Sequence, residues 1–330
     1  MRGPVLVTGA AGFVGGHLID LLGAERTHVV AWYRPGGTLP GRGTPPDRDA
    51  RAAGAAGPSF AGITWQAVDL LDAALVRRAL AGLRPGAVYH CAGAAHVGLS
   101  WRDAARTLAI NVRGTHNLLE GLRWTDTATK VVIPSSAMVY APAERALAED
   151  DPLVPRSPYA LSKLAQEMEG VRAIADGLGV TIARAFNHFG PRQDPFFAAS
   201  GFARRIADIE AGRWEPEIAV GNLDARRDLT DVRDTIRAYT QILEHGTAGR
   251  PYNVCSGRAI TIRELLDRLL ARARVPIRVR VDQARLRPND VPLLLGDPTR
   301  IHTELGWHPE IPLDRTLDDL LDDWRSRPRS

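Results

Sequence analysis

Tyr159 and Lys163 lie four residues apart in the segment Ser157–Lys163, and this spacing places both side chains on one face of a helix. Ser157 is a favourable N-cap and Pro158 suits the first helical position, so the sequence predicts that a helix begins here. A phenol has a pKa near ~10, and a neighbouring ammonium favours its phenolate form. The pair is therefore a candidate acid–base site, with a Tyr–Lys pair on a solvated helix face as the alternative.

Lysine is rare in this chain. Of the 42 Lys and Arg residues, only Lys130 and Lys163 are lysine. An ammonium is a compact point charge, whereas a guanidinium is a planar fork with fixed donors. A lysine kept at position 163 of such an arginine-rich chain indicates a requirement for the point charge.

Gly9, Gly12 and Gly15 follow the apolar segment Val5–Thr8 and precede a periodic apolar helix. Strand, glycine turn and helix form the context of a dinucleotide site. Gly9 would permit the tight turn, Gly12 the approach of a pyrophosphate, and Gly15 the close packing of helix on strand. The N–H groups that open the helix would bind the phosphates. A glycine-rich turn without a ligand is the alternative.

Polar or small residues follow the next predicted strands. Arg34 ends the strand 28–33, where an arginine accommodates the 2′-phosphate of NADP(H), so NADP(H) is favoured and NAD(H) stays possible. A solvated surface arginine is the alternative. Asp69 ends the strand 63–68 and could meet the adenine amino group or cap the helix expected at 72–81. His90, within the strand 87–91, is predicted to be a core histidine with its hydrogen bonds satisfied.

Strands at 63–68, 87–91 and 131–136 alternate with helices, one of which is expected at 103–123. This alternation predicts a parallel, doubly wound sheet with right-handed crossovers. Ligands bind such sheets beyond the carboxyl ends of the strands. Ser136 ends a strand and should therefore face the same crevice as Gly9.

The composition sets wider limits. Hydrophobic residues make up 45% of the 330 residues, charged residues 24%, and the net charge is +4. No apolar run approaches the ~20 residues that span a bilayer, and no basic stripe with interleaved aromatics indicates nucleic acid. The two cysteines, Cys91 and Cys255, predict neither a disulfide framework nor a zinc site. We therefore expect a soluble cytoplasmic protein with no metal site, no membrane and no nucleic-acid partner.

In this order, the three glycines, Asn111, Ser136, Tyr159 and Lys163 resemble the extended short-chain dehydrogenase/reductase (NAD-dependent epimerase/dehydratase) family, over essentially the whole chain. The resemblance implies an α/β fold with a doubly wound parallel Rossmann sheet and a smaller C-terminal α/β lobe that binds a nucleotide sugar. Residues 1–185 would form the dinucleotide-binding domain, strands from about 229–258 would return to it, and residues 186–330 would supply the lobe.

The family also implies roles for single residues. Tyr159 would be the acid–base group, Lys163 would bind the nicotinamide ribose and lower the pKa of Tyr159, and Ser136 would hydrogen-bond the reacting oxygen. The implied cofactor site comprises Gly9, Gly12, Phe13, Val14, Gly15, Arg34, Asp69, Leu70, Ala92, Ala94, Asn111, Tyr159, Lys163 and Phe186.

Segments 184–191, 220–234 and 286–292 resemble the GDP-mannose branch of the family. Arg227 would clamp the diphosphate, a bidentate role that suits a guanidinium, although a surface ion pair is the alternative. The branch usually has Glu where Asp290 stands, so that contact would need a shorter reach. The implied substrate residues are Ser136, Asn187, Val220, Asn222, Arg227, Arg287 and Asp290.

The dehydratases of the branch carry acidic residues directly after the position of Ser136, because they must move the C5 proton and the C6 hydroxyl. This chain has Ala137 and Met138 there. The resemblance then implies a homodimeric reductase that converts GDP-4-dehydro-6-deoxy-D-mannose to GDP-D-rhamnose with NAD(P)H. A nucleotide-sugar 4-epimerase is the main alternative, since the segment 136–140 is epimerase-like. A 4,6-dehydratase and a non-catalytic cofactor sensor are the remaining alternatives.

Overall fold

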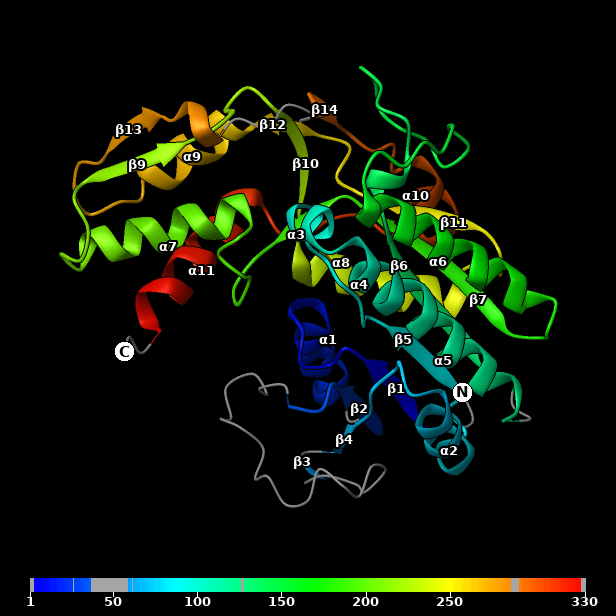
Figure 1. The fold of residues 1–330 in the computed structure, drawn as a ribbon. Coiled ribbons are helices and arrows are strands. Elements are labelled where there is room, and N and C mark those ends of the chain that lie inside the picture. The colour runs from blue at the N-terminus through cyan, green and yellow to red at the C-terminus, as the bar shows by residue number, and fades with distance from the viewer. Residues whose placement is uncertain are drawn as a thin grey trace. The chain divides into compact units, whose positions relative to one another are not determined.

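The computed structural model describes residues 3–25, 27–36, 59–60, 62–125, 128–285 and 291–327. The chain forms two compact units (Figure 1). Unit 1 comprises residues 1–141, 152–184 and 236–252, and unit 2 comprises residues 142–151, 185–235 and 253–330. No helix of the described residues is long and apolar enough to cross a bilayer.

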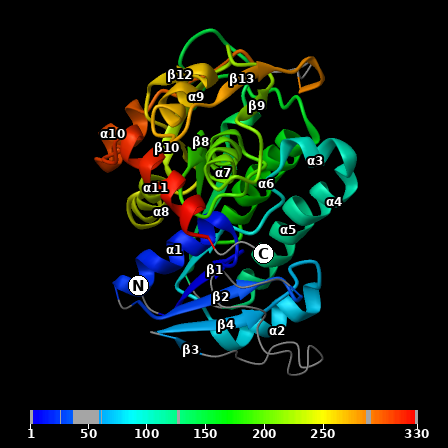
Figure 2. The same cartoon turned by 90° about the vertical axis from the view of Figure 1, so that its left-hand side faces the viewer.

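Unit 1 is built on an eight-stranded sheet of order β11-β7-β6-β5-β1-β2-β4-β3. β1 pairs in parallel with β2 on one side and β5 on the other, whereas the short β3 pairs antiparallel with β4. Figure 2 shows β1, β2, β4 and β3 side by side. The strands are β1 Val5–Thr8, β2 Val29–Tyr33, β3 Ser59–Phe60, β4 Ile63–Ala67, β5 Ala87–His90, β6 Lys130–Ser136, β7 Gly179–Ala185 and β11 Pro251–Val254.

This order confirms the predicted doubly wound sheet. The chain leaves β1 toward β2 and later returns to β5 on the other side of β1, so the order reverses between β1 and β5. A reversal of this kind opens a ligand crevice at the carboxyl ends of the two strands. All four residues of β1 are buried, as expected for a parallel strand covered on both faces.

Helices cover the sheet of unit 1. α2, α5 and α6 lie side by side on one face, while α1 packs on β1 and β2 (Figures 1 and 2). The helices are α1 Phe13–Ala24, α2 Ala73–Leu83, α3 Val97–Arg102, α4 Ala104–Leu108, the π-helix η1 Ala109–Arg113, α5 Gly114–Arg123, the 3-10 helix η2 Ala137–Val139 and α6 Pro158–Ile174.

Two local predictions are corrected. The helix expected at 103–123 is interrupted by η1, although Asp103 does cap its start by accepting from the N–H of Arg106. π-Helical turns inside helices are frequent at functional sites, and this one carries Asn111. The N-cap of α2 is Asp72, whose side chain accepts from Leu75 N. Asp69 does not cap this helix: its side chain accepts from Leu71 N in the preceding turn.

Unit 2 contains shorter sheets packed with helices. Its larger sheet has the order β12-β10-β14, with β8 also pairing with β10, and β9 pairs with β13. Apolar side chains of α7, α9 and α11 form its core. Its elements are β8 Asn187–Phe189, α7 Ala198–Glu210, β9 Glu217–Val220, β10 Arg226–Asp231, α8 Val232–His245 (which continues into unit 1), β12 Ala259–Thr261, α9 Ile262–Leu270, β13 Arg278–Val281, the 3-10 helix η3 Gln283–Arg285, β14 Leu293–Leu294, α10 Thr299–Leu305 and α11 Leu313–Ser326.

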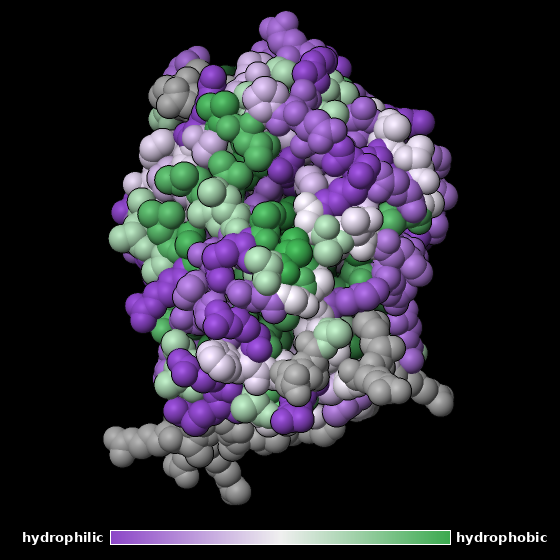
Figure 3. Space-filling model, turned by 90° about the vertical axis from the view of Figure 1, so that its right-hand side faces the viewer, coloured by the Kyte–Doolittle hydropathy of each residue, from purple (hydrophilic) through white to green (hydrophobic). Residues whose placement is uncertain are grey.

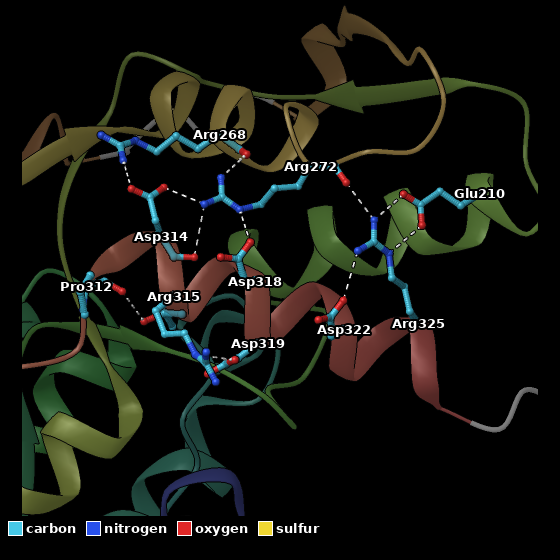
Figure 4. Close-up of polar contacts among 11 residues, drawn as sticks. Glu210, Arg268, Arg272, Pro312, Asp314, Arg315, Asp318, Asp319, Asp322 and Arg325 are labelled. Carbon is cyan, nitrogen blue, oxygen red and sulfur yellow. Dashed lines mark hydrogen bonds and ion pairs between the residues drawn. The ribbon is translucent and has the colours of Figure 1, made fainter.

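An ionic network lies along α9, α11 and α7 (Figure 4). Arg272 contacts Asp314 at 2.8 Å and Asp318 at 2.7 Å. Arg325 contacts Glu210 at 2.8 Å. The Arg272 pairs have carboxylates that are 54% and 55% exposed, and exposed pairs contribute at most about 1 kcal/mol each. The Arg325–Glu210 pair is more deeply buried.

Residues 142–151 lie in unit 2, whereas the sequence placed them with the first domain. Backbone hydrogen bonds explain this: Leu147 N donates to Leu295 O, and Asp297 N donates to Leu147 O, both at 2.9 Å. The strand expected at 251–255 is β11, which lies beside β7 in the main sheet as the sequence predicts.

Candidate active site

The turn after β1 needs two of its three glycines for steric reasons. Gly9 has φ +65°, and a Cβ there would lie 2.6 Å from the backbone of Ala92, which follows β5. A Cβ at Gly15 would overlap the carbonyl oxygen of Gly9. The turn is therefore folded tightly against the end of β5 at the point where the strand order reverses.

The start of α1 is suited to an anion. Its N-cap is Gly12, which makes no side-chain cap hydrogen bond, and its first turn, opened by the half-buried Phe13 and Val14, holds no acidic residue. Helix N-termini of this kind attract phosphate. Arg34 is exposed directly after β2, the strand beside β1. The glycine turn, the uncapped helix and this arginine together fit a dinucleotide that carries a 2′-phosphate.

Asn111 secures the loop after β5. Its Oδ1 accepts from Ala94 N at 2.7 Å, and its Nδ2 donates to Ala94 O at 3.2 Å and to Ser162 Oγ at 2.8 Å. Both amide protons are thereby used. In this structure Asn111 ties the half-buried loop containing Ala92 and Ala94 to α6, and its direct contact with a cofactor stays a prediction, as do those of the half-buried Asp69 and Leu70.

Ser136, Tyr159 and Lys163 meet at the carboxyl end of β6. They are 9%, 8% and 8% exposed, and the side chains of Ser136 and Tyr159 hydrogen-bond to each other. Ser157 caps α6 by accepting from Ala160 N, with Pro158 at the first position, as the sequence predicts. β6 and α6 therefore present three groups that can hold and protonate one reacting oxygen.

Burial controls the protonation of this site. It raises the pKa of Tyr159, and the hydrogen bond from Ser136 opposes that rise. The pKa of Tyr159 is therefore raised, not lowered as expected from the sequence, because burial outweighs the interactions that favour the phenolate. Burial also lowers the pKa of Lys163 to about 8, with Cys91 and Glu167 acting in the opposite direction. At neutral pH the phenol is protonated and the ammonium is mostly charged.

A buried ion pair supports the strand end that carries Ser136. Arg184 on β7 contacts Glu167 on α6 at 2.8 Å, and both side chains are at most 6% exposed. Glu167 also accepts from the hydroxyl of Ser135, and Arg184 donates to Tyr140 Oη at 3.0 Å. β6, α6 and β7 are thus tied together immediately around the candidate catalytic groups.

Sequence reasoning missed the residues that surround Lys163. Its Nζ donates to Pro134 O at 2.7 Å and to Gln166 Oε1 at 2.9 Å. Gln166 Nε2 donates to Thr115 Oγ1, which also contacts His90 Nε2. His90 is buried and its pKa is lowered to about 3, which confirms a core histidine with satisfied hydrogen bonds. The i, i+3 spacing from Lys163 to Gln166 is the signal that could have found this contact.

Apart from Ser136, which lies in unit 1, the residues implied for the substrate belong to unit 2. Asn187 on β8 is exposed, and Asn222 is exposed with its Oδ1 accepting from Asp224 N. Val220 on β9 is buried, so only its backbone could meet a ligand. Arg227 on β10 donates to Val291 O at 2.7 Å. Phe186 is 3% exposed in unit 2. Arg287 and Asp290 lie outside the described residues.

Unit 2 has a hollow of about 400 Å³ that the sequence analysis did not identify. Its walls include the exposed aromatic side chains of Phe196 and Trp214, and the Arg205 guanidinium lies 4.0 Å from the centre of the Trp214 ring. Arg204 and Arg285 also line it. Aromatic faces beside guanidinium groups can bind a planar base and an anion.

Comparisons with known proteins agree with this geometry. The sequence profile described as GDP-mannose 4,6 dehydratase matches residues 6–320. The chain is 38% identical to the GDP-6-deoxy-D-mannose reductase of Pseudomonas aeruginosa over 98% of both chains. A structure of RMD from Pseudomonas aeruginosa complexed with NADPH is 36% identical, with a TM-score of 0.81 over 99% of this chain and all of that chain.

A structure of Thermus thermophilus UDP-glucose 4-epimerase with NAD is 27% identical, with a TM-score of 0.82 over 98% of this chain and 99% of that chain. The sequence-based expectations of the family, the fold class, an NAD(P)-dependent enzyme of nucleotide sugars and the cofactor class are thereby confirmed. This chain belongs to the GDP-mannose 4,6-dehydratase family of extended short-chain dehydrogenases/reductases.

Proposed function

We propose that this enzyme reduces the C4 keto group of GDP-4-dehydro-6-deoxy-D-mannose with NADPH and so forms GDP-D-rhamnose. The observation that carries the proposal is the pairing of Ser136, Tyr159 and Lys163 with a segment that holds no acid. Ala137 is 1% exposed and Met138 donates its N–H to Ser136 Oγ. Neither side chain can move the C5 proton or protonate the C6 hydroxyl, so only a redox step at C4 is supported.

When bound, NADPH supplies a hydride to C4. Tyr159 donates its proton to the carbonyl oxygen as the C4–H bond forms, so the ketone becomes a secondary alcohol. Ser136 would hydrogen-bond the same oxygen and keep it next to the Tyr159 hydroxyl. Burial keeps Tyr159 protonated before the step, and the hydrogen bond from Ser136 favours the phenolate left afterwards. The nearby ammonium of Lys163 would favour the same phenolate. Arg34 favours the 2′-phosphate of NADPH.

The hollow of unit 2 is the proposed place of the nucleotide. A base would stack on Phe196 or Trp214, and Arg205 would contact the diphosphate. Arg204 and Arg285 also line the hollow or its rim, where they pair with Asp208 and Asp282. Asn187, Asn222 and Arg227 are the further substrate contacts that the family resemblance implies. A GDP-sugar with two negative charges suits a lining of three arginines and one aspartate, Asp208, better than a neutral sugar would.

We also propose that the enzyme is a homodimer formed through α6. Leu161, Met168 and Val171 are 49%, 66% and 51% exposed, and their spacing of seven and three residues gives one apolar seam. Figure 3 shows hydrophobic residues gathered in patches on the face that it displays. Two free cysteines agree with the reducing cytoplasm as its location.

The second candidate is a nucleotide-sugar 4-epimerase, favoured by the epimerase-like segment 136–140 and by the overall similarity to a UDP-glucose 4-epimerase. Incubation with GDP-4-dehydro-6-deoxy-D-mannose and NADPH separates the two. A reductase oxidises one NADPH for each sugar reduced. Absorbance measures the NADPH, and chromatography measures the sugar. An epimerase interconverts sugars with no net oxidation, and a cofactor sensor binds NADPH without turnover.

A further inference from the structure

A row of buried hydrogen bonds runs from the end of β1 to Lys163. Thr8 Oγ1 lies 2.8 Å from His90 Nδ1, and His90 Nε2 lies 2.8 Å from Thr115 Oγ1. Gln166 connects Thr115 to Lys163 at 2.8 and 2.9 Å. The first four side chains are at most 1% exposed and Lys163 is 8% exposed. The glycine turn and the candidate catalytic lysine are therefore joined through the core of unit 1.

The proton positions along this row follow from the groups that can only donate or only accept a hydrogen bond. Lys163 can only donate, so Gln166 must present Oε1 to it and Nε2 to Thr115. The single hydroxyl proton of Thr115 goes to the backbone carbonyl of Asn111 at 2.6 Å. Thr115 Oγ1 must therefore accept from Gln166 and from His90 Nε2–H.

The other end of the row is fixed by the neutral imidazole. Burial holds the pKa of His90 far below neutrality, so its Nδ1 carries no proton and accepts from the Thr8 hydroxyl. Thr8 Oγ1 in turn accepts from Ala92 N at 3.2 Å. If the Gln166 amide were reversed, its N–H groups would face the N–H groups of Lys163. Its oxygen would face Thr115, whose hydroxyl proton already goes to Asn111 O. The amide of Gln166 is thus locked in one orientation.

We propose that Gln166 is the positioning residue of Lys163: its locked amide holds the ammonium through a neutral acceptor and leaves the positive charge uncancelled for the reacting site. This proposal rests on the proposed function only for the effect of the Lys163 charge on the reaction. The neutrality matters because a carboxylate at the same place would orient Lys163 equally well but would neutralise it.

The other groups around Lys163 support this assignment. From β5 it is faced by His90, which is neutral, and by Cys91, whose pKa burial raises to about 12. On α6 it is faced by Tyr159, protonated at neutral pH, and by Glu167, whose charge is paired with Arg184. β6 contributes the carbonyl of Pro134 and η1 the amide of Asn111, neither of which titrates. Among the described side chains, Gln166 is the one that accepts a hydrogen bond directly from the Lys163 ammonium, and it is neutral.

The test is the titration of Lys163 itself. The chain has two lysines, and Lys130 is an exposed residue that donates to Glu244 O, so Lys130→Arg with ¹³Cε-labelled lysine leaves one NMR signal. In this background we expect a midpoint near 8. Gln166→Glu should raise the midpoint by at least about one unit, and Gln166→Met should lower it.

A matched pair tests the lock. Thr115→Val removes the acceptor that orients the amide and should lower the Lys163 midpoint, whereas Thr115→Ser retains the hydroxyl and should leave it unchanged. Thermal melts establish which variants fold. If Gln166→Glu does not fold, Gln166→Met and the Thr115 pair decide. Unchanged midpoints in the folded variants would overturn the proposal.

Activity gives an independent readout. In the Gln166 variants the alkaline limb of the kcat/KM profile should move in the same direction as the NMR midpoint, whereas a merely structural role lowers kcat/KM equally at every pH. The NMR titration requires no substrate. Shifted midpoints in an enzyme that reduces no GDP-sugar would therefore refute the proposed function and leave the role of Gln166 standing.

Discussion

At the scale of single residues, the pKa of Tyr159 matches the direction of the proposed reaction. A reductase needs a protonated phenol when the hydride arrives, and a raised pKa provides it. In the proposed reaction, Lys163 would act on the product side, where its charge would favour the phenolate. The sequence predicted a lowered pKa because spacing alone cannot reveal how deeply a phenol is buried.

Replacement of Tyr159 by phenylalanine should lower kcat by at least ~10²-fold, the scale of lost general acid catalysis. The ring and its packing are retained, so NADPH binding, measured by fluorescence titration, should change little. Steady-state kinetics with the keto sugar give the comparison. Retained turnover would remove Tyr159 from the mechanism.

The kcat/KM profile should fall as the pH rises through about 8, because the Lys163 ammonium is present below its pKa of about 8 and is lost above it. Lys163→Arg supplies the control, since a guanidinium does not titrate in this range. That variant should be slower but should lack this limb. An unchanged limb in Lys163→Arg would assign the limb to another group.

The candidate catalytic residues could be found in the sequence because their types and spacing are local. Ser136, Tyr159 and Lys163 are placed by one strand end and one helix, and the structure brings them together. Gln166, Thr115 and His90 come from three elements whose contact depends on tertiary packing. Only the spacing of Gln166 from Lys163 was visible in the sequence.

At the scale of elements, the Glu167–Arg184 pair fixes α6 against β6 and β7. Glu167→Gln would leave the Arg184 charge buried without its partner, and we expect a loss of about 3–5 kcal/mol in the free energy of unfolding. Urea denaturation measures this loss.

Glu169→Gln is the matched control on the same helix, because Glu169 is 24% exposed and pairs with Arg172 at the surface. The free energy of unfolding of this variant should fall by less than about 1 kcal/mol. Equal losses in the two variants would contradict the structural role assigned to the buried pair.

Strand positions and the start of α6 could be predicted from apolar runs and from Ser157–Pro158. The π-helix at Asn111 could not, since its sequence is compatible with an ordinary helix. Asp69 and Asp72 illustrate a similar limit: both are capping residues by type, and only the observed contacts with Leu71 N and Leu75 N separate them.

At the scale of the whole molecule, the candidate catalytic groups and the hollow lie in different units. Unit 1 holds the glycine turn and the Ser–Tyr–Lys site, and unit 2 holds the hollow with its aromatic and arginine lining. The family resemblance implied a set of substrate residues, which stay a prediction. Phe196, Arg205 and Trp214 form a hollow only through folding. Arg287 and Asp290 remain predictions.

The α6 seam predicts the oligomeric state. Val171→Glu should convert the dimer to a monomer, because it buries a charge in the proposed interface. Val281→Glu, at a position equally exposed at 51% on β13, should leave the dimer intact. Light scattering after size exclusion gives the masses. A dimer in both variants would exclude the seam as the interface.

The most direct test of the account follows the hydride. The enzyme is incubated with GDP-4-dehydro-6-deoxy-D-mannose and NADPH that carries deuterium at both C4 positions of the nicotinamide, and the product is analysed by NMR. We predict one deuterium at C4 of the reduced sugar for each NADPH oxidised, and none with Tyr159→Phe beyond its residual rate. A product without deuterium at C4, or sugar conversion without NADPH oxidation, would contradict the account.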